Sequence, residues 1–268
     1  MPPLFGLRDV SFDYDGIPAV RQLSLQIAAG ERVALLGANG SGKSTLLRIL
    51  DGLYPASQGT VSFDGELLTP ERLQDDKFAL PFRRRVGLVF QNPDVQLFNP
   101  TVWDEVAFAP LQLRWPKEQV IARVEQSLEL MRISQLRDRP PYRLSGGEKK
   151  RVALASVIVL EPEVLLLDEP TATLDPRSQS QIIDLIHEWK GSSKTVITAT
   201  HQLEIVEDIA DRIVVMEEGR VTASGPASEI LGDQELLLQA NLVHSHRHSH
   251  GGVTHSHPHI HSHAKHEH

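Results

Sequence analysis

A glycine-rich stretch constrains this chain more than any other feature of its sequence. The residues Gly37-Ala-Asn-Gly-Ser-Gly-Lys-Ser44 follow the run 32–37, which is apolar after its first residue, and precede residues 45–53, which have helical spacing. The apolar run predicts a strand that is buried on both faces. A strand, spaced glycines, a lysine, a serine and a helix in this order are the pattern of a phosphate-binding loop.

The residue types in this loop suit the binding of nucleotide phosphates. Gly37, Gly40 and Gly42 allow the backbone to wrap around a phosphate with its N–H groups pointing inward, and the next helix adds its positive N-terminal end. Lys43 is placed to reach the terminal phosphates, and the Ser44 hydroxyl is suited to ligate Mg²⁺. A plain glycine-rich turn is the alternative, but such a turn needs neither the lysine nor the serine.

The rest of the chain predicts a mainly parallel sheet. Further buried strands are expected at 85–91, 163–170 and 194–201, and residues 92–160 have a mostly helical pattern. Strands that alternate with helices build parallel sheets with helices on both faces, and ligands bind beyond the carboxyl ends of such strands. Antiparallel hairpins are expected around Asp15-Gly16, around Asp64-Gly65 and within 212–225.

Polar residues follow the carboxyl ends of these predicted strands. Asp168 is suited to hold Mg²⁺, and Glu169 to orient and deprotonate an attacking water. Gln91 offers an amide oxygen to the metal or the water, and a neutral His201 imidazole is suited to hydrogen-bond the terminal phosphate. Each residue alone fits a solvated strand end or a loop as well. The phosphate-binding loop favours the functional interpretation.

A second glycine-rich motif lies outside the series of strands. Within residues 144–151, Ser145, Gly146 and Gly147 offer backbone amides at the start of a predicted helix, with Glu148 near its N-terminal end. One nucleotide site does not need two such anion cradles, and spacing alone gives no role for the second.

Together, the motifs resemble those of the ATP-binding cassette (ABC) ATPase family over residues 1–240. One position departs from that family: Thr173 lies in the segment that resembles the D-loop, where a smaller residue is more usual. We expect no loss of activity from this difference. The motifs occur in the family's order: a Walker A loop at 37–45, the Q-loop glutamine Gln91, the signature at 144–148, Walker B at 164–169, a D-loop at 173–176 with Asp175 as its acid, and the switch histidine His201.

The resemblance implies an α/β fold with a P-loop NTPase (RecA-like) core, an antiparallel β subdomain and a helical signature subdomain. The core with its β subdomain is expected in residues 1–91 and 160–225, and the helical subdomain in 92–159. A C-terminal helical extension is expected in 226–243, followed by a disordered histidine-rich tail in 244–268.

The same resemblance implies ATP hydrolysis, with ATP and Mg²⁺ as cofactors, by a head-to-tail pair of ATPase subunits. The signature of one subunit then closes over the ATP held by the other. The expected catalytic residues are Glu169, His201, Gln91 and Lys43, and the expected Mg²⁺ ligands are Ser44, Gln91 and Asp168. The expected nucleotide contacts are Tyr14, which stacks on adenine, Gly37, Ala38, Asn39, Gly40, Ser41, Gly42, Lys43, Ser44, Thr45, Ser145, Gly146, Gly147 and Asp175.

A narrower resemblance is carried by residues 91–110 and 144–176, which are similar to the energy-coupling factor branch and, within it, to the cobalt/nickel group. It implies a transmembrane coupling subunit, a substrate-capture membrane subunit and a second ATPase, identical or a paralogue, at the cytoplasmic face of the cell membrane. The alternatives are the same role in a vitamin importer, and a metal-binding or storage protein on an ABC scaffold.

The composition argues against several other classes of protein. The formal net charge is -8, so a nucleic-acid partner is not expected, and the short stretch 92–144 leaves no room for the coiled-coil insertion of ABC ATPases that act on DNA. The absence of cysteine excludes disulfides. No apolar run is long enough to span a membrane, and the N-terminal residues lack the pattern of a signal peptide.

Histidine dominates the end of the chain, because all of the 13 histidines except His187 and His201 lie from His244 onward. Imidazoles suit Ni²⁺ and Co²⁺, and the interspersed Ser, Gly, Pro and Thr differ from the uninterrupted run of a cloning tag. Metal buffering, a functionless solvated tail and a tag are the three interpretations, and we favour the first. The expected ligands are His244, His246, His248, His250, His255, His257, His259, His261 and His263.

Overall fold

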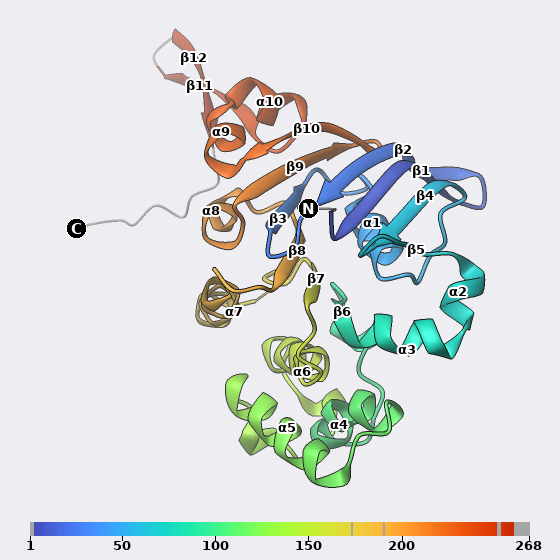
Figure 1. The fold of residues 1–268 in the computed structure, drawn as a ribbon. Coiled ribbons are helices and arrows are strands. Elements are labelled where there is room, and N and C mark those ends of the chain that lie inside the picture. Colours follow the sequence, from blue (N-terminus) through green and yellow to red (C-terminus); the bar gives the residue numbers. More distant parts are fainter. Residues whose placement is uncertain (1–2, 173, 190, 251–252, 260–268) are drawn as a thin grey trace.

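The computed structural model describes residues 3–172, 174–189, 191–250 and 253–259, and a six-stranded sheet lies at its centre (Figure 1). The strand order is β10-β9-β3-β8-β7-β6, and all neighbours are parallel except β10 and β9. The buried strands and the closing hairpin predicted from the sequence are confirmed. The strands are β3 (Arg32–Leu36), β6 (Val86–Val89), β7 (Val164–Asp168), β8 (Thr195–Thr200), β9 (Arg212–Glu217) and β10 (Arg220–Pro226).

The parallel arrangement brings the ends of the central strands to one edge of the sheet. Every residue of β3, β7 and β8 is buried, as expected for parallel strands that are covered on both faces. The register pairs Leu36 with Thr200, and Asp168 with Ala199. The loops that follow these three strands therefore meet at the same edge.

A second, four-stranded antiparallel sheet has the order β2-β1-β4-β5. The turns Asp15-Gly16 and Asp64-Gly65 have positive φ at both residues, as two-residue hairpin turns require, and both predicted hairpins are confirmed. The strands are β1 (Phe5–Tyr14), β2 (Ile17–Ile27), β4 (Gln58–Phe63) and β5 (Glu66–Leu67).

The two faces of the central sheet are covered differently. Val33 and Leu35 point into a core shared with α1 (Lys43–Leu50), α3 (Asp76–Arg85) and the four-stranded sheet. The opposite face packs against helices from the second half of the chain. Helices therefore cover both faces, as predicted, and the four-stranded sheet is added on the first face, where its own apolar side is buried.

The helices between β6 and β7 gather at one end of the molecule, away from the four-stranded sheet (Figure 1). From residue 90 to residue 163, all of which the structure describes, there is no strand, as the sequence predicts. The elements are η1 (Pro93–Val95), α4 (Val102–Gln112), α5 (Lys117–Leu130), η2 (Ser134–Leu136), η3 (Pro141–Arg143) and α6 (Gly146–Ile158).

The other helices surround the central sheet or follow its last strand. None of the helices in the described part of the chain has the length and apolar character needed to cross a membrane. The remaining helices are α2 (Pro70–Gln74), α7 (Pro176–Glu188), η4 (Leu203–Ile205), α8 (Val206–Ile209), α9 (Ala227–Gly232) and α10 (Gln234–Gln239).

Part of the histidine-rich segment has strand backbone over the residues that the structure describes. Strands β11 (His244–His250) and β12 (Val253–His259) pair in antiparallel register. The alternation of histidine with other residues has the period of two that suits a strand. A two-stranded ribbon alone is only marginally stable in water. The predicted ligands His261 and His263 lie outside the described residues.

Candidate functional site

A cleft of about 470 Å³ brings together most of the residues predicted to bind nucleotide. It lies at the edge of the central sheet where β3, β6 and β7 end. Its walls come from both sheets, because the β1–β2 hairpin faces the glycine-rich loop. The lining residues are Tyr14, Ile17, Pro18, Ala19, Asn39, Gly40, Ser41, Gly42, Lys43, Ser44, Thr45, Gln91 and Glu169.

The glycine-rich loop wraps tightly around the side chain of Lys43. A Cβ atom on Gly37 would lie 2.3 Å from the carbonyl oxygen of Met216, and Gly42 has a φ of 101° at the start of α1, so both positions require glycine. The Lys43 ammonium donates to the carbonyl oxygens of Gly37 at 2.7 Å and Ala38 at 3.0 Å. Burial lowers the pKa of Lys43, and the charges of Glu169 and Asp168 oppose that shift.

Ser44 and Asp168 form a pair of side chains that suits a metal ion. The Ser44 hydroxyl donates to Asp168 Oδ1 at 2.8 Å, and the Asp168 side chain is buried at the end of β7. Gln91 is exposed and lines the same cleft. A hydroxyl, a carboxylate and an amide are the hard oxygen donors that Mg²⁺ prefers, so these residues fit the predicted metal.

Glu169 combines burial with a strained backbone. The residue is only 4% exposed, and its φ of 46° lies in the left-handed region, which is costly for a residue other than glycine and common at functional sites. Glu169 Oε1 lies 2.8 Å from Nδ1 of His201, and the Thr200 hydroxyl donates to Oε2 at 3.4 Å. The carboxylate is therefore fixed in orientation from the end of β8.

Tyr14 lies at the rim of the cleft within a cluster of aromatic rings. Its hydroxyl lies 3.2 Å from the Thr45 hydroxyl, and its ring contacts those of Phe12 and Tyr54 edge-on at 5.0 Å and 5.8 Å. The ring is partly exposed. It is thus a preorganised, accessible aromatic surface beside the glycine-rich loop.

The signature residues do not belong to this cleft. Ser145 caps α6: its hydroxyl accepts from the Glu148 N–H at 3.3 Å, and Glu148 Oε2 accepts from the Ser145 N–H at 2.8 Å. Hydrogen bonds from Ser145 lower the pKa of Glu148. None of residues 145–147 is among the described residues that line the cleft. The structure therefore separates the two anion cradles that the sequence predicts.

Asp175 lies beside the signature rather than in the cleft. It caps α7 by accepting from the N–H groups of Arg177 and Ser178, and the Ser178 hydroxyl donates to Oδ2 at 2.7 Å. The bonds from Ser178 lower its pKa. A Cβ atom on Gly147 would lie 3.8 Å from Asp175 Oδ2. Thr173 lies outside the described residues.

Lys150 is the residue that the sequence analysis missed. Its ammonium donates to the carbonyl oxygens of Phe90 and Gln91, both at 2.9 Å, and burial lowers its pKa to about 8. A signal was present in the sequence, because Lys150 stands at helical spacing from the apolar residues Ala153 and Leu154. A lysine on an apolar stripe needs buried acceptors.

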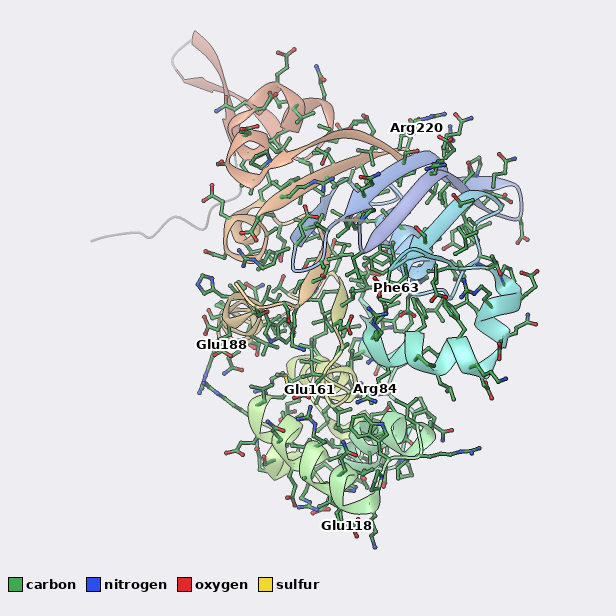
Figure 2. The ribbon with its side chains drawn as sticks, viewed as in Figure 1. Phe63, Arg84, Glu118, Glu161, Glu188 and Arg220 are labelled. Atoms are coloured by element: carbon green, nitrogen blue, oxygen red, sulfur yellow. The ribbon has the colours of Figure 1, made fainter. Side chains whose placement is uncertain are left out.

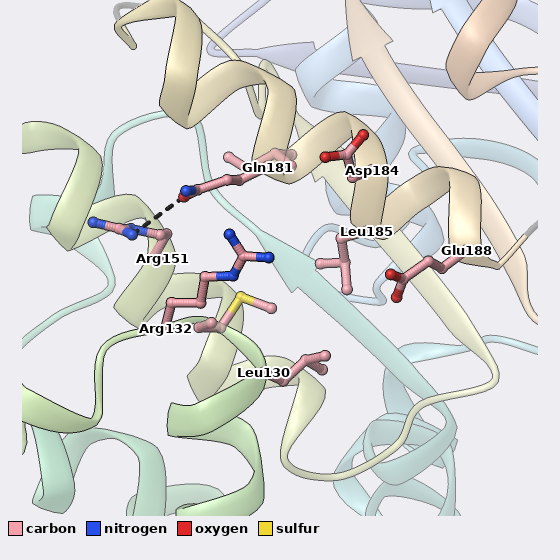
Figure 3. Close-up of a pocket in the computed structure, with 9 residues that line it drawn as sticks. Leu130, Arg132, Arg151, Gln181, Asp184, Leu185 and Glu188 are labelled. Carbon is pink, nitrogen blue, oxygen red and sulfur yellow. Dashed lines mark hydrogen bonds between the residues drawn. The ribbon is translucent and has the colours of Figure 1, made fainter.

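A smaller cavity of about 140 Å³ lies where α6 and α7 meet the loop after α5 (Figure 3). Arg151 donates to Gln181 Oε1 at 3.2 Å across it, and Arg132 also lines it. No residue that the sequence predicts for the nucleotide site lines this cavity.

The fold and the site together define the class of protein. A glycine-rich loop after β3, an aspartate and a glutamate at the end of β7, and a helical region with its own glycine-rich cap are the parts of an ATP-hydrolysing cassette. The chain belongs to the ABC transporter family, whose sequence profile matches residues 20–172. It is an ATPase that serves transport.

Two relatives are similar over nearly the whole chain. The nickel import ATP-binding protein NikO of Rhodobacter capsulatus is 54% identical, over 91% of this chain and 97% of that protein. The energy-coupling factor transporter ATP-binding protein EcfA of Methanothermobacter thermautotrophicus is 44% identical, over 88% of this chain and 75% of that protein.

Two solved structures share the fold. The structure of cbiO1 from Clostridium perfringens, described as part of the ABC transporter complex cbiONQ, has a TM-score of 0.75 and 37% identity, over 90% of this chain and 96% of that chain. The ATP-binding cassette MJ0796, solved as a dimer bound to ADP and Pi, has a TM-score of 0.74 and 28% identity, over 83% of this chain and 98% of that chain.

Proposed function

We propose that this chain is the ATP-hydrolysing subunit of an energy-coupling factor importer for nickel or cobalt ions. The observation that carries the proposal is the cleft in which the glycine-rich loop, Gln91 and Glu169 meet. The likeness to NikO and EcfA supports the substrate and the type of importer. A vitamin importer with the same ATPase is the second candidate, because the resemblance to the branch does not depend on the substrate.

The polar residues in and beside the cleft have separate roles in hydrolysis. Lys43 and the loop amides bind the phosphates, and the Tyr14 ring stacks on the adenine. Ser44, Asp168 and Gln91 would hold Mg²⁺, which would neutralise phosphate charge when bound. Glu169 takes a proton from the water whose oxygen bonds to the γ-phosphorus, while the bond from that phosphorus to ADP breaks. His201 orients Glu169 through Nδ1, which leaves Nε2 for the terminal phosphate.

A second ATPase subunit, identical or a paralogue, completes the site. Residues 145–147 lie outside the cleft of their own subunit, and the amides at the start of a helix form an anion site. The dimer of MJ0796 supports such a pairing. The Ser145 face and Asp175 of one subunit then close over the nucleotide of the other, and opening and closing of the pair drives the membrane partner.

Replacing Ser145 with arginine tests this head-to-tail pairing. We expect ATP hydrolysis to fall by about 100-fold or more, because the long side chain blocks the partner's nucleotide, while the mutant's own cleft keeps its affinity for ATP. In mixed dimers with one Ser145→Arg subunit, the silenced site should be the one in the wild-type subunit. Ser134→Arg, which adds the same side chain at an exposed position of the helical region, is the control. Silencing of the mutant's own site would contradict the pairing.

Exposed apolar side chains support a docking face for a membrane partner. Val95 and Phe98 are each 67% exposed, and the Phe98 ring contacts the Phe108 ring edge-on at 4.9 Å. A groove of about 690 Å³ runs between α3 and the helical region, with Arg84 and Glu161 among its lining residues (Figure 2). Exposed apolar clusters of this kind mark protein interfaces.

This face is consistent with two proposed partners: the transmembrane coupling subunit, which would bind it, and the substrate-capture subunit, which would be reached through the coupling subunit. It also supports a place at the cytoplasmic face of the cell membrane, reached through those partners. The acidic net charge of -8 gives no support to a nucleic-acid partner.

The tail supports transition-metal binding near the transporter. In the part of the chain that the structure describes, no group of three or more His, Cys, Asp or Glu side chains is placed to hold a metal ion. The backbone register nevertheless sets His246 opposite His257, and His248 opposite His255. Imidazole is a ligand that suits Ni²⁺ and Co²⁺. We therefore assign the tail to local buffering of Ni²⁺ or Co²⁺.

A stop codon after Val243 tests both the substrate and the tail. Uptake of labelled Ni²⁺ and Co²⁺ is measured in cells that carry the intact transporter, with the full chain, the truncated chain and Glu169→Gln. We expect ATP-dependent uptake by the full chain, and a severalfold loss at low metal on truncation, because fewer imidazoles then concentrate the ion.

The two parts of this proposal fail in different ways. Uptake that is indifferent to truncation contradicts the buffering role and leaves the importer intact. No metal uptake, with ATP hydrolysis preserved, contradicts the metal assignment and favours a vitamin. Metal bound by the tail without any ATP-dependent uptake favours a storage protein on an ABC scaffold.

A further inference from the structure

A buried lysine joins the signature helix to the ends of two core strands. Lys150, which is 2% exposed, donates to the carbonyl oxygens of Phe90 and Gln91 at 2.9 Å and lies 3.5 Å from that of Asp168. An ammonium group has three N–H donors, and here it has three main-chain acceptors. Burying a charge is costly unless it is hydrogen-bonded, so this arrangement needs all of them.

The acceptors belong to the two segments that carry the proposed Mg²⁺ ligands. Gln91 follows β6, and Asp168 is the last residue of β7. The lysine itself belongs to α6, five residues after Ser145, which corresponds to about 7.5 Å along the helix. One side chain thus connects the face that meets the second subunit with both strand ends.

Other contacts attach the same loop to α6. The Gln96 amide oxygen accepts from the Phe90 N–H at 3.2 Å, and its NH₂ group donates to the carbonyl oxygen of Ala153 at 2.9 Å. Lys149 forms an ion pair with Asp94 at 2.6 Å. The loop from Phe90 to Gln96 is therefore positioned by α6 along its whole length, and Lys150 is the contact nearest to the cleft.

We propose that Lys150 is a positioning residue for ATP hydrolysis, which sets Gln91 and Asp168 in place when the signature helix meets the nucleotide of the second subunit. Lys150 lines no part of the cleft, so it acts only through the residues that it holds. The inference rests on the role proposed above for Gln91.

Replacing Lys150 with methionine keeps the length of the side chain and removes its donors. In the assembled transporter we expect kcat for ATP to fall about 10- to 100-fold, the range found when supporting contacts of a metal site are lost. KM for ATP should stay within about twofold, because the loop amides, Lys43 and Tyr14 are unchanged. A lysine with similar chemistry serves as control: Lys194 donates to the carbonyl oxygen of Pro162 at 2.9 Å, and Lys194→Met should leave kcat unchanged.

A double-mutant cycle with Gln91→Ala separates positioning from a general loss of structure. If Lys150 acts through Gln91, the rate loss of the double variant should be clearly smaller than the product of the two single losses, and what remains of the Lys150 effect is the part that acts through Asp168. Rate losses that multiply, or a rise in KM equal to the fall in kcat, would overturn the inference. If Lys150→Met does not fold, the cycle is made with Lys150→Gln, which keeps an NH₂ donor and should retain an intermediate kcat. The inference would also be overturned if Lys150→Gln kept the full kcat and its cycle with Gln91→Ala showed no coupling.

The same measurements distinguish a failure of the underlying proposal. If Gln91→Ala alone hydrolyses ATP at the normal rate, the proposed role of Gln91 is wrong, and the inference falls with it. If Gln91→Ala is slow and Lys150→Met is not, only the inference about Lys150 is wrong.

Discussion

Glu169→Gln is expected to stop turnover while ATP stays bound. Glutamine has the same shape as glutamate and can place its one oxygen where Glu169 Oε1 lies 2.8 Å from Nδ1 of His201. Its NH₂ group then takes the place of Oε2, which lies 3.4 Å from the Thr200 hydroxyl. Its amide has no capacity to accept a proton from water. The loss of a general base lowers kcat by about 10²- to 10⁴-fold, and the variant should accumulate as a closed pair with bound ATP.

Single-turnover hydrolysis and equilibrium ATP binding are the measurements that test this. The affinity for ATP should be equal to or higher than that of the wild type, because the closed state is no longer emptied by hydrolysis. Glu118→Gln makes the same chemical change at the far end of the helical region (Figure 2) and should leave both quantities unchanged. A normal rate of hydrolysis in Glu169→Gln would show that another group removes the proton.

The strand ends were predictable from the sequence because their signals are local. The apolar run before Gly37 and the run that ends at Asp168 each predict a strand buried on both faces. Parallel strands place their carboxyl ends at one edge, so the meeting of the loop, Gln91 and Glu169 in one cleft follows from the pattern alone. The hairpin turns were equally local, because Asp-Gly pairs favour two-residue turns.

Other features depend on contacts between distant segments, which no local pattern contains. The four-stranded sheet covers one face of the core because Leu7 and Val61 need apolar partners, and the sequence shows that need without showing where it is met. Lys150 finds its acceptors about 60 residues earlier in the chain, at Phe90 and Gln91. The strain at Glu169 arises from tertiary packing and has no sequence signature.

The second large effect is expected from Lys43→Ala, which should abolish tight binding of ATP. The Lys43 ammonium is the one side-chain cation among the residues that line the cleft, and it is 6% exposed at the centre of the loop. A hydrogen bond to a charged group contributes about 1.5–3 kcal/mol, so the affinity should fall by at least about 10- to 100-fold. The loop amides and the helix N-terminus remain and account for the residual binding.

Titration with ATP and with ADP gives a further test of the position of Lys43. Because the ammonium reaches the terminal phosphates, the loss of affinity should be larger for ATP than for ADP, and AMP should be affected least. Lys77→Ala, which removes an exposed lysine from α3, is the control and should bind all three normally. Thermal unfolding shows whether loss of the bonds to the Gly37 and Ala38 carbonyl oxygens has weakened the fold. If folded Lys43→Ala bound ATP with an affinity within about twofold of the wild type, the assignment of this loop to phosphate binding would be contradicted. Glu169→Gln, in contrast, is expected to lose turnover and keep its ATP binding. The two variants therefore separate binding from chemistry in one cleft.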